Sequence, residues 1–280
     1  MAIGVSLRLS RAMLFVCAFC FVVLLYAPST MAKSANLDWS GVSSDEVERI
    51  RAMLDEQQIE KRLSAFVDRS LLLKKEVLIV VYPGFELFLD TASGISYLPF
   101  QMLRQLEASI TERYARQAVR QKIFAAAVEH LLWVQLGKAL VSQFSLPIQG
   151  EPAYALDGFA TVMLLNLHDS AYLLDATEEY LLVDQTGEAL VSGEGKSELE
   201  FDKSRYQLIV CTVVGKDFDK FQNSQPELAW APARRAQCER RYQAQISEWY
   251  AALQPYLKPE NRIRYWLPEQ PSDFLEEGSN

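Results

Sequence analysis

The order of two patterns along the chain most constrains what it can fold into. Between Glu76 and Pro99, the segment EVLIVVYPGFELFLDTASGISYLP is rich in β-branched and aromatic residues and is broken by turn residues such as Pro83-Gly84. This pattern indicates a small sheet of two or three strands. From Pro99 onward, apolar residues recur at helical spacing almost to the end of the chain. We therefore predict an α+β fold that is mostly α-helical, with a small β-sheet before the long helices.

Turn and breaker residues bound the predicted helices. After the sheet, helices are expected over about 100–116, 118–144, 152–178, 197–214 and 233–254. Before the sheet, residues 33–75 are predicted to form an N-terminal helical segment. It begins with a linker over 33–42. A helix follows, which starts at a capping box of Ser43 and Glu46 and reaches about Leu73. A turn is predicted at 184–187, and residues 258–280 are a Pro-rich, acidic C-terminal tail.

Residues 1–32 have the order of a secretory signal peptide. Arg8 and Arg11 precede an almost wholly apolar stretch from Ala12 to Ala27, and Thr30-Met31-Ala32 supplies the small residues of a cleavage site. The apolar run is about 16 residues, which is short of the roughly 20 that span a bilayer. Cleavage is therefore favoured over retention as a membrane anchor. We predict a periplasmic or secreted protein that meets the membrane only through this peptide before its cleavage.

Cysteine usage agrees with an exported chain. Cys17 and Cys20 lie in the signal peptide, which leaves Cys211 and Cys238 in the mature protein. Two cysteines in an exported protein most simply form one disulfide. Two free, buried thiols remain the alternative. A zinc site built from these two residues alone does not fit, because structural zinc takes four protein ligands.

The charge of the chain bears on its partners. It has 36 acidic and 28 basic residues, for a net charge of −8, and its lysines and arginines form no run. A protein that binds nucleic acid needs a clustered basic face to neutralise phosphates. Nucleic acid is therefore excluded as a partner.

Residues 131–140, LLWVQLGKAL, have the frame of a zinc-peptidase helix without its chemical groups. Such a helix carries His-Glu-x-x-His, in which both histidines bind the metal and the Glu acts as general base. Here Val134 has no lone pair, Gln135 is an amide that accepts no proton at neutral pH, and Lys138 presents an ammonium group. We expect neither a catalytic residue nor a metal ligand at these positions.

The chain has only two histidines, His130 and His168, and they fall on different predicted helices. A relocated metal site that uses both, together with Glu129 or Asp169, stays open as an alternative. Histidines in such surroundings are more often ordinary core or surface residues.

Residues 76–255 resemble a bacterial family of exported metallopeptidase-like proteins that is classed as a domain of unknown function. These proteins are gluzincin-like and carry a His-Glu-Leu-Gly-His-Ala-Leu helix. The landmarks that follow this helix recur here in the same order, within "FSLPIQGEPAYALDGFATVMLLN", "SRYQLIVCTVVGKDF" and a final segment with the second cysteine. They are Leu146, Pro147, Gly150, Asp157, Phe159, Ala160, Arg205, Tyr206, Cys211, Gly215, Arg235, Ala236, Cys238 and Trp249. Residues 33–75 do not align.

This resemblance implies a zincin-like, gluzincin-type domain over residues 76–257. It maps the two zinc histidines onto Val134 and Lys138, the general base onto Gln135, and a third ligand, a Glu, onto Ala153. Only Asp157 is retained, as the residue expected to orient a ligand. Zinc is therefore expected of the family, but its ligands are missing, and we predict no cofactor.

A retained scaffold with a replaced site is typical of a pseudoenzyme. We expect an exported, metallopeptidase-like protein with a degenerate zinc site that binds an unidentified peptide or protein of the cell envelope without cleaving it. Two alternatives remain. One is an active metallopeptidase or other hydrolase with an unrecognised site, and the other is a structural envelope protein with no cleft function.

Overall fold

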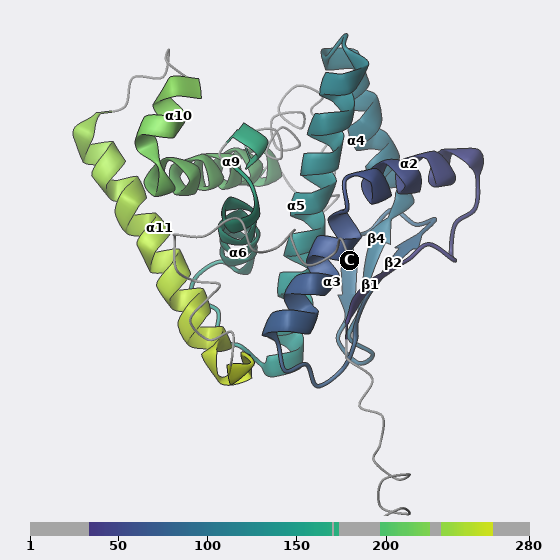
Figure 1. Cartoon of the computed structure of the whole chain (residues 1–280), viewed down its shortest axis with the longest axis horizontal. Coiled ribbons are helices and arrows are strands. Elements are labelled where there is room, and N and C mark those ends of the chain that lie inside the picture. The colour runs from purple at the N-terminus through teal and green to yellow at the C-terminus, as the bar shows by residue number, and fades with distance from the viewer. Residues whose placement is uncertain (1–33, 170, 174–196, 225–230, 260–280) are drawn as a thin grey trace, which may run out of the picture. The chain divides into compact units, whose positions relative to one another are not determined.

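A computed structural model describes residues 34–169, 171–173, 197–224 and 231–259 of the chain. The predicted signal peptide, the turn at 184–187 and all but the start of the C-terminal tail lie outside these residues. The described elements run from a small sheet and two short helices to a set of longer helices (Figure 1). This order confirms the predicted α+β class.

The sheet has four strands, one or two more than the sequence predicts. They are β1 (Ala35–Asp38), β2 (Val77–Tyr82), β3 (Phe88–Asp90) and β4 (Ile95–Pro99), in the order β1-β2-β4-β3. β1, β2 and β4 are parallel, and β3 runs antiparallel to β4 at one edge. The prediction of a linker over 33–42 is therefore wrong in part. β1 has only four residues, and its place in the sheet depends on β2, which begins 42 residues after β1 begins (35 to 77).

The strands alternate in burial, as expected for a sheet that is covered on one face. Val77, Ile79 and Val81 of β2 are buried, whereas Leu78 and Val80 between them are only half-buried. The buried face lies against the long helix that follows the sheet, since α5 (Gln117–Phe144) contacts β2, β3 and β4.

Two short helices precede β2, where the sequence predicts one long helix. They are α2 (Asp45–Glu56) and α3 (Ile59–Ser70). The break lies at Gln58, whose backbone is left-handed at φ 54°. The side chain of Ser44, and not that of Ser43, caps α2 by accepting a hydrogen bond from the Val47 amide at 3.2 Å. The N-cap therefore lies one residue later than predicted, and it is not part of a capping box, because the residue three positions after Ser44 is Val47.

After the sheet come α4 (Phe100–Arg113), α5 and α6 (Pro152–Leu167). α5 ends where Ser145 adopts a left-handed conformation, two residues before Pro147, close to the predicted boundary. The prediction that the next helix reaches residue 178 is wrong. α6 ends at Leu167, because His168 is extended at φ −135° and ψ 170°.

Of the described residues, only α5 is long and apolar enough to cross a bilayer. In this structure, 94% of its apolar window is buried inside the protein. Trp133 of α5 meets Phe66 of α3 and Phe159 of α6 edge-on, and Phe159 in turn contacts Trp249 of α11 (Pro232–Leu253). These contacts are typical of a core helix.

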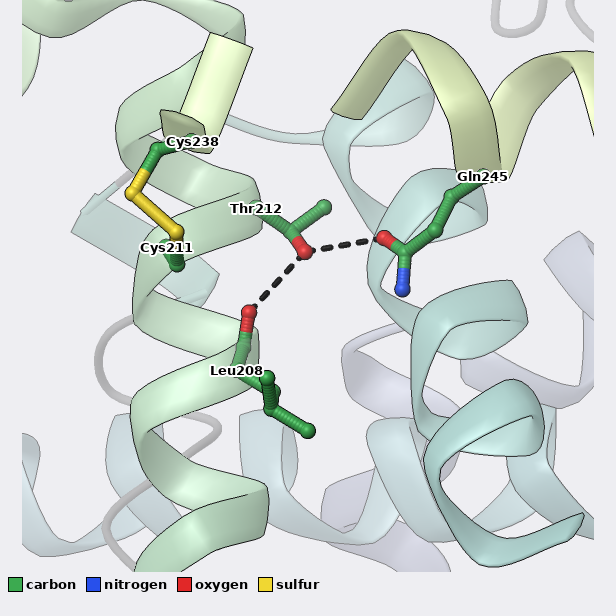
Figure 2. The surroundings of a disulfide bond; sticks show 5 residues. All are labelled: Leu208, Cys211, Thr212, Cys238 and Gln245. Atoms are coloured by element: carbon green, nitrogen blue, oxygen red, sulfur yellow. Dashed lines mark hydrogen bonds between the residues drawn. A yellow bond between two sulfur atoms is a disulfide. The ribbon is translucent and has the colours of Figure 1, made fainter. Parts of the chain in front are cut away.

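The last helices are α9 (Ser197–Lys216), α10 (Phe218–Ser224) and α11, which is followed by the short η1 (Gln254–Tyr256). A disulfide joins Cys211 of α9 to Cys238 of α11, as the sequence predicts. Figure 2 shows this bond and, one residue on, Thr212, whose hydroxyl lies 2.8 Å from the Gln245 side-chain oxygen and 2.9 Å from the Leu208 carbonyl. α9 and α11 are thus joined covalently and by a polar contact.

Candidate functional site

Gln135, which the resemblance maps onto the general base, belongs to the protein core. Its side chain is fully buried, and its Oε1 accepts a hydrogen bond from the Ser96 hydroxyl of β4 at 2.7 Å. An amide in this place ties α5 to the sheet. Val134 beside it is 5% exposed and packs with the apolar core. Both residues therefore have ordinary structural roles.

Gly137 allows α6 to approach α5 closely. A Cβ atom at this position would lie 2.9 Å from Cδ1 of Phe159 and 3.0 Å from Cδ2 of Leu156, both on α6. Any larger residue would force these side chains apart. The close approach brings the next residue, Lys138, within electrostatic reach of Asp157, which follows Leu156 on α6.

Asp157 is held by an arginine from a third helix. Its carboxylate is buried and accepts two hydrogen bonds from Arg205 of α9, from Nε at 2.6 Å and from Nη2 at 2.8 Å. A bidentate arginine–carboxylate pair of this kind is strong and fixes geometry. The sequence marks Arg205 only as a landmark, because it lies 48 positions after Asp157 and nothing local indicates their contact.

Lys138 is half-buried beside this ion pair. Burial, which disfavours the ammonium form, lowers the pKa of Lys138, and the charge of Arg205 lowers it further. The Asp157 carboxylate opposes this shift only in part. Burial and the Arg205 charge thus both disfavour the charged form of Lys138, and the Asp157 carboxylate does not fully offset them.

The structure brings two of the predicted site residues, Lys138 and Asp157, together across α5 and α6. Val134 and Lys138 are four residues apart and share a face of α5, and Ala153 and Asp157 have the same spacing on α6. Lys138 and Asp157 interact electrostatically across the two helices. Gln135, in contrast, is engaged with β4.

The groups at these positions do not fit a zinc ion. Val134 and Ala153 are aliphatic and offer no ligand atom, and the ammonium group of Lys138 would repel a dication. Asp157 is already bound to Arg205. Within the described ranges, no group of three or more His, Cys, Asp or Glu side chains is placed to hold a metal ion.

Comparison with protein families places the chain in a known family. A family model described as "Putative metallopeptidase" matches residues 39–253. The chain belongs to this family. The match also covers α2 and α3, which the sequence landmarks leave unaligned. No curated protein and no solved structure matches the chain.

In this family member, the residues of the predicted relocated site meet only in part. Glu129 of α5 is fully buried, and its Oε2 lies 3.2 Å from Nε2 of His168. Arg62 of α3 donates to both carboxylate oxygens, at 2.8 and 2.7 Å, and the Tyr172 hydroxyl donates to Oε2. The carboxylate is therefore saturated by protein donors and is not available as a metal ligand.

The Glu129 cluster shifts two pKa values. Burial alone would raise the pKa of Glu129, but the contacts with His168 and Arg62 outweigh burial and lower it to about 2. Burial and the neighbouring Glu129 charge raise the pKa of Tyr172. At neutral pH the cluster therefore holds an ionised Glu129 and a neutral Tyr172, which is the arrangement that their hydrogen bond requires.

A separate, mainly apolar groove of about 420 Å³ lies at the turn between α5 and α6. The Leu146-Pro147 landmark forms one side, and the last turns of α11 around Trp249 form the other. This groove could accommodate an apolar side chain of a partner. The sequence points to it only through the landmark residues, because it forms from segments about 100 residues apart, from Leu146 to Trp249.

Proposed function

We propose that this metallopeptidase family member is an exported pseudoenzyme that binds a peptide or protein of the cell envelope without cleaving it. The family match supports the scaffold. The signal-peptide pattern of residues 1–32 supports export. The observation that carries the loss of catalysis is the group of Lys138, Asp157 and Arg205.

Metal-dependent hydrolysis requires an ion with an open coordination position and a base that activates water. At the mapped positions, the chain presents a lysine in place of a ligand and a core amide in place of the base. The only carboxylate of the set is held by an arginine. The lysine and the arginine-bound carboxylate oppose binding of the metal, and the amide cannot act as the base.

The first test measures zinc in the purified protein and in a restored variant. We expect the natural protein to contain less than about a tenth of a zinc ion per chain, since it lacks the ligand set that such an ion requires. The variant Val134→His/Gln135→Glu/Lys138→His/Ala153→Glu should bind close to one zinc ion, because it supplies the three ligands and the base. Metal analysis after dialysis measures both.

A second variant keeps Ala153 and changes only the three α5 residues. It should bind zinc much more weakly, since it lacks the third ligand. Stoichiometric zinc in the natural protein, or peptide hydrolysis by it that a chelator abolishes, would refute the pseudoenzyme. A restored variant that folds, as judged by its circular dichroism, and binds no zinc would show that the mapped positions are wrong.

The binding half of the proposal has its own readout. The natural protein, immobilised, should retain members of a random hexapeptide library without cleaving them, as measured by mass spectrometry of the retained and released fractions. Retention of none of the peptides would contradict the proposed function.

A further inference from the structure

We infer that Lys138 binds a carboxylate of the bound peptide, at the position that the metal takes in the family. This inference rests on the proposed function, since it names the chemical group that the same site recognises. The carboxylate can come from the C-terminus of the peptide or from an acidic side chain.

The first observation is the state of the lysine itself. Lys138 is half-buried on α5, and within the described part of the chain it has no hydrogen bond or ion pair. A lysine that gives up hydration in a folded protein normally gains an acceptor in exchange. The ammonium group of Lys138 carries three donors, and the carboxylate of a bound peptide can accept from them.

The second observation is the use of the neighbouring acid. Asp157 accepts two hydrogen bonds from Arg205 and is buried with them. Asp157, the acid that acts on Lys138, is therefore already paired with Arg205. The positive charge of Arg205 in turn disfavours the ammonium form of Lys138. Lys138, Arg205 and Asp157 together carry a net charge of +1, which attracts an incoming anion.

Among anions, a carboxylate is the one that a peptide ligand would bring to the ammonium group of Lys138. A peptide supplies carboxylates without modification, and one ammonium group pairs with one carboxylate through short, charge-assisted hydrogen bonds. Compared with bidentate arginine, a lysine offers a compact point charge. The lowered pKa of Lys138 agrees with a cation that lacks its counter-ion until a ligand binds.

The test uses the full mature protein and three hexapeptide libraries. The first library has free C-termini and no Asp or Glu, the second has amidated C-termini and contains Asp and Glu, and the third is amidated and lacks both acids. We expect retention of the first or the second library at least about tenfold above that of the third, as for one charge-assisted contact. Which of the two is retained identifies the source of the carboxylate.

Variants assign this preference to the lysine. Lys138→Gln should lower retention of the preferred library about tenfold and bring it to the level of the third, while Lys138→Arg should keep part of the preference. Lys122→Gln makes the same charge change at an exposed position on the same helix and should have no effect. The thermal unfolding of each variant shows whether it is folded. If Lys138→Gln does not fold, the comparison of Lys138→Arg with the natural protein still tests the inference.

Equal retention of all three libraries, or an unchanged preference in folded Lys138→Gln, would overturn the inference and leave the proposed function standing. Retention of no library would instead overturn the proposed function, and the assignment to Lys138 with it. The two failures are therefore distinguishable.

Discussion

At the scale of single residues, Glu129 shows how a buried charge is tolerated. Arg62, Tyr172 and His168 approach its carboxylate from α3 and from the segment after α6. A buried acid without such partners would cost several kcal/mol and would stay protonated. With them, its pKa falls to about 2. The ionic part of the contacts that link these three parts of the chain therefore depends on an ionised Glu129.

This link predicts a specific acid sensitivity. The pKa of Glu129 is lower in the folded state than its ordinary value of 4.5, so its contribution to stability is complete above pH 4.5 and is lost as the pH falls toward about 2. The shift corresponds to roughly 3 kcal/mol. Urea unfolding should show the stability difference between the natural protein and Glu129→Gln shrinking by about this amount between pH 7 and pH 2.

The control for this measurement is Glu107→Gln. Glu107 pairs with Arg49 in an exposed ion pair, for which a constant difference within about 0.5 kcal/mol is expected across the same range. If the stability difference for Glu129→Gln does not change between pH 4.5 and pH 2, the buried ion cluster has no role in acid stability.

At the scale of helices, two glycines set how closely neighbours pack. Gly137 of α5 faces two side chains of α6, whereas Gly215 of α9 faces the backbone of α11. A Cβ at Gly215 would overlap the Cys238 carbonyl group. Side chains can rotate away from an added methyl group, but a helix backbone can move only as a whole.

The same substitution should therefore have unequal effects at the two positions. Gly215→Ala should destabilise the protein by about 1–3 kcal/mol, since it forces α9 and α11 apart. Gly137→Ala should cost less than about 1 kcal/mol, because the preference of helices for alanine offsets the shift of Phe159 and Leu156. Chemical denaturation of both variants measures the difference, and equal losses would contradict this account of the packing.

At the scale of the whole molecule, the disulfide constrains the C-terminal half of the chain. Cys211 and Cys238 are 27 residues apart in sequence and join α9 to α11, which also contacts α6. Closing a loop of this length removes freedom from the unfolded chain. The bond therefore stabilises the packing around α6, the helix that carries Ala153 and Asp157.

Removing this bond should lower stability without changing the fold. Cys211→Ala/Cys238→Ala should lose roughly 3–4 kcal/mol of unfolding free energy at 25 °C. The natural protein should lose a similar amount on reduction, and the double variant should be insensitive to the reductant. Urea titrations with and without dithiothreitol test this, and a loss below about 1 kcal/mol would rule out the disulfide as a main source of stability.

The sequence by itself predicted the features that depend on residues close together along the chain. The α+β class, the approximate limits of α5 and the cysteine pair follow from periodicity, breaker residues and cysteine count. The spacing of Val134, Gln135 and Lys138 on one helix was also readable, since a helix places residues by number alone. The family match supports the resemblance that these landmarks indicate.

Only the tertiary structure decided the features that depend on distant partners. β1, the break at Gln58 and the early end of α6 have weak local signals. The contacts of Asp157 with Arg205, Gln135 with Ser96 and Glu129 with Arg62 join residues 48, 39 and 67 positions apart. The charge around Lys138 depends on such contacts, because a side chain's electrostatic surroundings are set by proximity in space and not by order along the chain.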